Sequence, residues 1–75
     1  MRLDSAKLRE ARQRRLLTQA ELGKRAGTTE ATVNRLENGL QTARISTIRK
    51  LAEALEVPAE ELITWETETK GKAAA

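Results

Sequence analysis

The sequence contains no cysteine and no histidine, and Trp65 is its only aromatic residue. Without cysteine the chain can form neither a disulfide framework nor a thiolate metal site. Without histidine it lacks the commonest general base and the commonest metal ligand. One aromatic residue is too few for the base-stacking surfaces that bind single-stranded nucleic acids. There is no glycine-rich phosphate loop either, and the carboxylates are scattered, so we expect no enzymatic activity, no metal ion and no other cofactor.

Long apolar runs are also missing. A membrane-spanning helix needs about 20 mostly apolar residues, and no segment of this sequence approaches that length. The N-terminus carries charges but lacks the apolar region of a secretory signal. The sequence therefore predicts a cytoplasmic protein with no membrane segment.

The length of the chain limits the number of domains, and its charge distribution indicates the kind of partner. Seventy-five residues form one domain at most, with a small core. The net charge of +3 divides unevenly, because residues 1–44 carry +5 and residues 45–75 carry −2. A basic first half suits a polyanionic partner, and solvated charged helix faces are the alternative.

Helix-forming residues fill the segments between four glycines and one proline, which predicts an all-α fold of five short helices. Asp4 is the expected N-cap of the first helix. Thr18 and Glu21 form a capping box for the second, and Thr29 caps the third. The fourth helix has one apolar face (Ile45, Ile48, Leu51, Ala52 and Leu55). The predicted ranges are 5–14, 19–26, 30–38, 46–55 and 58 to 63 or 65.

The fifth helix is expected to begin at Pro58, because proline favours the first helical position. Residues 66–75 show no apolar periodicity. We therefore expect a domain over residues 1–65 and a flexible tail over residues 66–75, whose end resembles a cloning remnant.

The second and third helices meet the requirements of a helix-turn-helix. Gly23 lies where the two backbones must approach closely, and Gly27 supplies the positive φ that the turn needs. Leu22, Val33 and Leu36 are placed to lock the pair together.

Three motifs in this stretch are distinctive: Leu17-Thr18-Gln19-Ala20-Glu21-Leu22, Gly27-Thr28-Thr29 and the segment from Val33 to Leu36-Glu37-Asn38-Gly39. They resemble the phage-repressor and Cro type (Xre-type) of helix-turn-helix, and the likeness extends over about residues 5–64. The resemblance implies a compact five-helix lambda-repressor-like bundle whose third helix enters the major groove. It implies a sequence-specific double-stranded DNA-binding transcriptional regulator, a repressor that binds a palindromic operator as a homodimer. An antitoxin-like regulator that also binds a partner protein, such as a toxin, is the alternative.

The resemblance also implies roles for particular residues. Base edges would be contacted by Glu30, Ala31, Thr32, Asn34 and Arg35. Phosphates would be contacted by Arg12, Thr18, Gln19, Thr29, Asn38 and Arg44. Arg35 suits guanine or a phosphate, and Asn34 suits adenine or the backbone. Glu30 suits the cytosine amine, with a dipole-favoured first helical residue as the alternative.

Other positions are expected to be structural. Arg12 and Glu37 match an ion pair that ties the first helix to the end of the third. Leu16 and Glu56 stand where many members of the family have glycine, and Ala43 stands where many have proline. Leu62, Ile63 and Trp65 are candidates for a dimer contact, with core packing as the alternative for Trp65. An exposed solubilising charge is expected at Arg9, Arg14, Arg15, Lys24 and Arg25, with a phosphate contact as the alternative.

Overall fold

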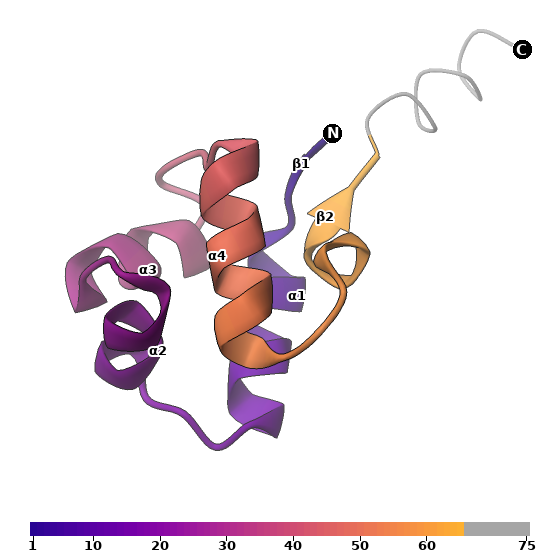
Figure 1. Cartoon of the computed structure of the whole chain (residues 1–75). Helices are drawn as coiled ribbons and strands as arrows, with labels where there is room; N and C mark the ends of the chain where they lie inside the picture. The colour runs from indigo at the N-terminus through magenta and orange to yellow at the C-terminus, as the bar shows by residue number, and fades with distance from the viewer. Residues whose placement is uncertain (66–75) are drawn as a thin grey trace, which may run out of the picture.

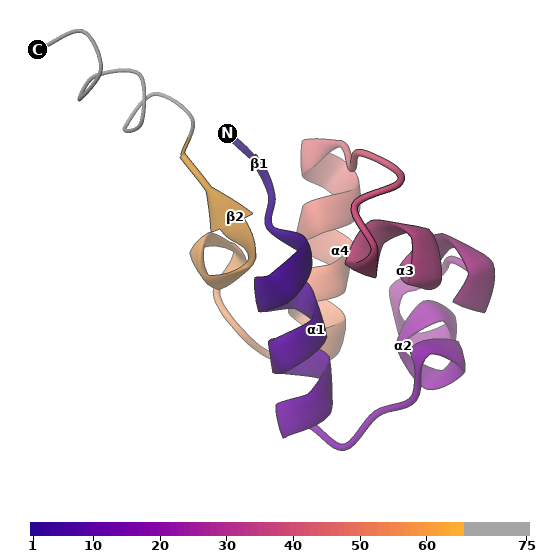
Figure 2. The ribbon, with the colours of Figure 1, turned by 180° about the vertical axis from the view of Figure 1, so that it is seen from behind.

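The structure is a computed structural model that describes residues 1–65 of the chain. In chain order its elements are β1 (Arg2–Leu3), α1 (Ser5–Arg14), α2 (Gln19–Ala26), α3 (Glu30–Glu37), α4 (Ile45–Leu55), the 3-10 helix η1 (Ala59–Leu62) and β2 (Ile63–Thr64). Helix α4 lies in the middle, with α2 and α3 on one side and the two strands on the other (Figure 1). Figure 2 shows the same arrangement from behind. The predicted tail falls outside the described residues.

The predicted starts of the first three helices are confirmed, and α4 begins one residue earlier than predicted, at Ile45. The Asp4 carboxylate accepts the backbone N–H three residues ahead at 3.0 Å, which caps α1. The capping box of α2 is complete, since Thr18 Oγ1 accepts the Glu21 N–H at 3.0 Å and Glu21 Oε1 accepts the Thr18 N–H at 2.8 Å. Thr29 Oγ1 caps α3 by accepting the N–H of Thr32 at 3.1 Å. Each cap satisfies an amide that would otherwise lack a partner.

The core is aliphatic and is shared by all four α-helices. Helix α2 packs against α3 and α4, while α1 packs against α3 and η1. Full burial of one such side chain stabilises the fold by about 1.5–3 kcal/mol. A few fully buried side chains therefore suffice to stabilise a chain of this size. The large apolar side chains that are fully buried within residues 1–65 are Leu8, Leu22, Val33, Leu36, Leu51, Leu55 and Leu62.

The expected fifth α-helix is wrong, and with it the five-helix count. Pro58 is the N-cap of η1, not its first residue, and η1 is a single 3-10 turn. The chain then becomes extended at Ile63 (φ −120°, ψ 159°). It does so because its backbone pairs with β1 in an antiparallel register that sets Leu3 opposite Ile63. Within residues 1–65 the structure therefore has four α-helices.

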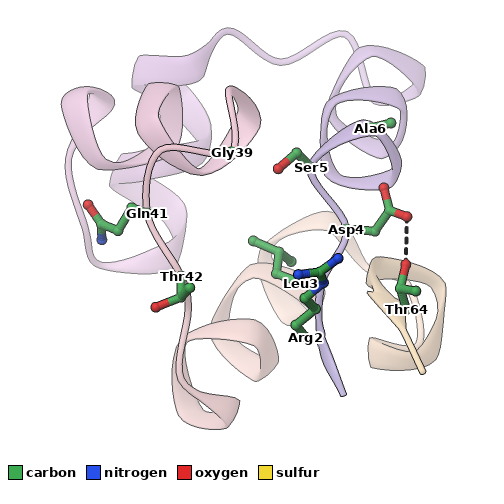
Figure 3. A pocket seen from close by; sticks show the side chains of 9 residues that line it. All are labelled: Arg2, Leu3, Asp4, Ser5, Ala6, Gly39, Gln41, Thr42 and Thr64. Atoms are coloured by element: carbon green, nitrogen blue, oxygen red, sulfur yellow. Dashed lines mark hydrogen bonds between the residues drawn. The ribbon is translucent and has the colours of Figure 1, made fainter. Parts of the chain in front are cut away.

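The strand pair closes the domain around the start of α1. The backbone N–H of Asp4 donates to the carbonyl of Leu62 at 2.7 Å. The hydroxyl of Thr64 donates to Asp4 Oδ2 at 2.7 Å, which is the dashed line in Figure 3. That hydrogen bond, and to a lesser degree the one that caps α1, lowers the pKa of Asp4. One carboxylate thus caps a helix and fastens the C-terminal strand.

Three apolar side chains differ in burial from what the sequence predicts. Ile45, expected on the buried face of α4, is 55% exposed at the first position of that helix. Leu62 and Ile63, suggested for a dimer contact, are buried in the domain's own core. Trp65 is 43% exposed, so it is the suggested contact residue that remains available.

Leu16 and Glu56, the residues that replace the family's usual glycines, both adopt the left-handed conformation. Their φ values are 56° and 58°. For residues other than glycine this conformation costs roughly 1–2 kcal/mol. Arg15 bridges the two turns, because its guanidinium donates to the Glu56 carboxylate at 3.1 Å and to the Glu56 carbonyl at 3.0 Å.

Candidate nucleic-acid interface

The junction of α2 and α3 has the geometry that a helix-turn-helix requires. A Cβ at Gly23 would lie 2.7 Å from the backbone carbonyl carbon of Thr29, a distance that real contacts do not reach. Gly27 ends α2 with φ 74° and ψ 28°, as its place in the sequence predicts. The two helices therefore meet backbone to backbone, and α3 is held at a fixed angle across α2.

Helix α3 divides into a buried face and an exposed face. Val33 and Leu36 are fully buried. The exposed face carries the residues expected to meet base edges, of which Thr32 is the half-buried exception. A shallow surface hollow of about 390 Å³ lies over this face, lined by Gln19, Glu30, Ala31, Asn34 and Arg35. Four of the five predicted base contacts therefore share one surface with Gln19.

The two threonines expected near phosphates are engaged in capping. Thr18 Oγ1 accepts the Glu21 N–H. Thr29 Oγ1 accepts the Thr32 N–H and donates to the Thr32 hydroxyl at 3.1 Å. Both threonines mark exposed helix starts, where the helix dipole favours an anion.

Arg12 and Glu37 form a buried ion pair between α1 and α3. Arg12 Nε lies 2.5 Å from Glu37 Oε2, and Arg12 Nη2 donates to Glu37 Oε1 at 3.0 Å. Arg12 Nη1 donates to the Leu17 carbonyl at 2.8 Å. The guanidinium, whose side chain is 14% exposed, is thus directed inward. This geometry favours the structural role of Arg12 over the predicted phosphate contact.

The burial of Glu37 is offset by its hydrogen bonds. Burial raises the pKa of Glu37, but hydrogen bonds from Arg12 and Gln19 and the charges of Arg12 and Arg9 lower it, and the net shift of the pKa is downward. The hydrogen bond to Glu37 raises the pKa of Arg12. The pair is therefore ionised at neutral pH.

Three amide side chains from the predicted interface are bonded to one another. Gln19 Nε2 donates to Glu37 Oε1 at 3.1 Å, and Asn34 Nδ2 donates to Gln19 Oε1 at 3.3 Å. Asn38 Nδ2 donates to the Asn34 carbonyl at 2.8 Å and to Asn34 Oδ1 at 3.2 Å. Asn38 Oδ1 accepts a hydrogen bond from Arg9 at 3.4 Å. The sequence predicts a solubilising surface charge at Arg9, with a phosphate contact as the alternative, and no sequence signal places its side chain beside Asn38.

The helix-turn-helix family matches residues 8–62, which include the α2–α3 unit and most of the core. This chain belongs to the Xre-type helix-turn-helix family.

A relative of this helix-turn-helix chain is the HTH-type transcriptional regulator RghRB of Bacillus subtilis, which is 44% identical over 57 residues. Those residues make up 75% of this chain but only 41% of the relative. The restriction-modification controller protein C.AhdI of Aeromonas hydrophila has a similar structure. Its TM-score is 0.77 at 32% identity, over 79% of this chain and 89% of the controller.

Two further structures share this helix-turn-helix fold. The P22 c2 repressor, solved in complex with a synthetic operator, has a TM-score of 0.76 at 22% identity, over 85% of this chain and 97% of the repressor. The hypothetical transcription factor NHTF from Neisseria has a TM-score of 0.76 at 26% identity, over 91% of this chain and 78% of that factor. At these identities the repressor shows the fold alone.

The cations of this helix-turn-helix domain fall into two groups. Arg14 pairs with Glu10 at 3.3 Å, and Arg15 pairs with Glu56 at 3.1 Å. Arg35 and Arg44 are exposed and make no ion pair or hydrogen bond with any side chain of residues 1–65. Arg35 lies on the exposed face of α3, and Arg44 is the N-cap residue of α4. Both guanidinium groups are thus available to a ligand.

No helix within residues 1–65 combines the length and the apolar character needed to cross a membrane.

Proposed function

We propose that this chain is a sequence-specific double-stranded DNA-binding transcriptional regulator that inserts α3 into the major groove. One observation carries the proposal: α3 buries Val33 and Leu36 while its opposite face gathers Asn34 and Arg35 at one surface hollow. The major groove is wide enough for a helix, and each base pair presents a distinct pattern of donors and acceptors there.

The exposed side chains of α3 offer chemistry for base recognition. Arg35 pairs bidentately with guanine O6 and N7, and Asn34 pairs with adenine N6 and N7. Glu30 accepts from the cytosine amine, and Ala31 contacts a thymine methyl group. The helix starts at Thr18 and Thr29, with Gln19, Asn38 and Arg44, hold phosphates on either side. We assign Thr32 a place beside the bases and Arg12 a structural role.

Repression would follow from occupancy, because a protein bound at an operator blocks polymerase. A module of this size buries about 600–1,000 Å² on DNA, so two copies on a palindrome are needed for a tight and specific site.

We propose that the second copy binds at the apolar groove between α4, η1 and β2. This groove has a volume of about 370 Å³ and a mostly aliphatic lining completed by Trp65. Arg49 and Glu60 also line it, and within residues 1–65 neither has an ion-pair partner. In a two-fold interface the same patch faces itself, so Arg49 of one copy would meet Glu60 of the other.

Selection of bound sequences from random duplexes tests the DNA proposal. We expect one enriched motif with two inverted half-sites. If no sequence is enriched and every duplex binds equally at low salt, the proposed function is wrong.

Sedimentation of the free protein tests the dimer. Ile45→Glu places a charge in the groove and should shift the equilibrium to monomer. Leu40→Glu is the matched control, since Leu40 is also an exposed aliphatic residue (75%) but lies outside the groove. Equal effects of the two variants would contradict this interface.

A further inference from the structure

Five polar side chains from three helices form one continuous hydrogen-bonded chain beside the exposed face of α3. It runs from Arg9 through Asn38, Asn34 and Gln19 to Glu37. We propose that this chain fixes which way round the Asn34 amide faces a base, and that Arg9 and Asn38 act as positioning residues for base recognition. The inference rests on the proposed function, because it specifies how Asn34 would read DNA.

Each link of the chain joins an N–H group to an oxygen in the same sense. Arg9 Nη2 donates to Asn38 Oδ1 at 3.4 Å, and Asn38 Nδ2 donates to Asn34 Oδ1 at 3.2 Å. Asn34 Nδ2 donates to Gln19 Oε1 at 3.3 Å, and Gln19 Nε2 donates to Glu37 Oε1 at 3.1 Å. The three amides are therefore arranged head to tail.

The two ends of the chain determine its direction. A guanidinium group can only donate hydrogen bonds, and an ionised carboxylate can only accept them. The Glu37 carboxylate is fully buried beside Arg12, which keeps it charged. Turning Asn34 over would set N–H against N–H at Asn38 and oxygen against oxygen at Gln19. Turning all three amides over would set an N–H against the Arg9 guanidinium and an oxygen against the Glu37 carboxylate.

A fixed amide matters because an asparagine reads adenine with both of its polar atoms. The amide nitrogen donates to N7 and the amide oxygen accepts from the N6 amine. Each amide nitrogen has a second N–H, and each oxygen has a second lone pair, so Asn34 can keep its internal bonds while binding a base. Its nitrogen faces the Gln19 side and its oxygen faces the Asn38 side. For one register of α3 in the groove, this order of donor and acceptor matches the N7 acceptor and N6 donor of adenine. A base edge that presents the two groups in the reversed order is excluded.

The test compares base preferences of wild type, Asn34→Ala, Arg9→Gln and Arg14→Gln by selection from random duplexes. Arg14 is the matched control, because it lies on the same helix, is exposed and pairs with Glu10 outside this chain. Losing one positive charge should weaken binding of both glutamine variants to all duplexes. Only Arg9→Gln should reduce the preference at the base pair that Asn34→Ala abolishes. We expect a reduction of about threefold or more, out of the roughly 5- to 150-fold discrimination that one good amide–base contact gives.

A second variant and a second measurement guard against trivial effects. Asn38→Asp keeps the size of the side chain but cannot donate to Asn34 Oδ1, so it should reduce the same preference. In the free protein, the side-chain NH2 resonances of Asn34 should shift in Arg9→Gln and Asn38→Asp but not in Arg14→Gln. Unchanged thermal midpoints of these exposed-site variants would show that the fold is intact.

Two results overturn the inference alone: an unchanged preference in both Arg9→Gln and Asn38→Asp, or a wild-type motif that Asn34→Ala does not alter. If the wild-type protein enriches no motif, the proposed function fails and this inference fails with it.

Discussion

Arg12 on α1 and Glu37 at the end of α3 are in direct contact, with Arg12 Nε 2.5 Å from Glu37 Oε2. The Glu37 side chain is fully buried, so the pair both joins the two helices and supplies the fixed charge beside Gln19. A pair of this kind is costly to break from one side only, because the remaining charge stays buried.

The first prediction concerns this ion pair. Arg12→Met should lower the free energy of unfolding by about 3–5 kcal/mol, since the buried Glu37 carboxylate then keeps only the longer ion pair with Arg9 at 3.7 Å. Glu37→Leu should cost less, because the Arg12 side chain that loses its partner is partly exposed. The double variant should be more stable than either single variant, because an apolar pair leaves no charge unpaired. Arg14→Met, which breaks the exposed pair with Glu10, should cost no more than about 0.5 kcal/mol. Urea unfolding of the four variants measures these differences.

The second prediction concerns acid. Folding lowers the pKa of Glu37 below its ordinary value of 4.5, so the unfolded chain binds more protons as the pH falls. The stabilisation is complete above the unfolded pKa and is lost as the pH falls through the folded pKa. The lowered pKa of Asp4 acts in the same direction.

Glu37→Gln should therefore be less stable than wild type at neutral pH, with a shallower loss of stability towards low pH. Urea unfolding between pH 7 and pH 3 compares the two proteins. Parallel curves for wild type and variant would exclude Glu37 as a source of the acid sensitivity.

The third prediction concerns the close approach of α2 and α3 at Gly23. In an exposed helix, glycine to alanine stabilises by about 1 kcal/mol. At Gly23 the added Cβ would meet the Thr29 backbone at 2.7 Å, so the helices must separate. We expect a loss of about 1–3 kcal/mol, typical of overpacking. Ala20→Gly on the exposed face of the same helix is the control and should also lower the thermal midpoint, because glycine disfavours a helix. A higher midpoint for Gly23→Ala would contradict the close approach of the two backbones.

The fourth prediction concerns the left-handed residues. Leu16→Gly removes a strain of roughly 1–2 kcal/mol and adds a glycine entropy cost of about 0.5–1 kcal/mol, so it should stabilise slightly. Glu56→Gly should gain less, because it also removes the carboxylate that pairs with Arg15. Thermal unfolding should rank Leu16→Gly above wild type. A lower midpoint would show that the Leu16 side chain contributes more than its exposure of 90% suggests.

The fifth prediction separates two kinds of DNA contact. Arg35→Ala should relax the preference at one base pair by about 1–3 kcal/mol. Arg44→Ala should weaken binding to all sequences about equally and reduce the salt-dependence slope by about 1. Binding titrations at several salt concentrations, on the selected site and its single-base variants, distinguish them. The reverse pattern would mean that the two roles are exchanged.

Local chemistry explains why most of this fold could be predicted. Asp4, Thr18 and Thr29 are caps whose hydrogen bonds involve only the next few residues, so their sequence context is enough. Gly27 predicts a left-handed turn for the same reason, since its conformation depends on local chemistry alone. The Arg12–Glu37 contact was accessible only through the family resemblance, since 25 residues separate the partners.

The features that the sequence did not reveal depend on distant partners. A two-residue strand has no periodicity, so the pairing of Leu3 with Ile63 is invisible before the domain closes. The same pairing explains why the segment after Pro58 does not continue as an α-helix. The place of Arg9 beside Asn38 depends on how α1 crosses α3, which side-chain spacing does not give.

The position of the strand pair also determines where a fluorophore or a surface linker can be attached to the domain. Met1 directly precedes β1, and this N-terminus lies on the side of the molecule away from α2 and α3 (Figures 1 and 2). A fluorophore or surface linker placed at Met1 would therefore leave the exposed face of α3 unobstructed. Because Met1 also lines the groove proposed for the second copy, protein immobilised in this way should present single α3 helices that each bind one half-site.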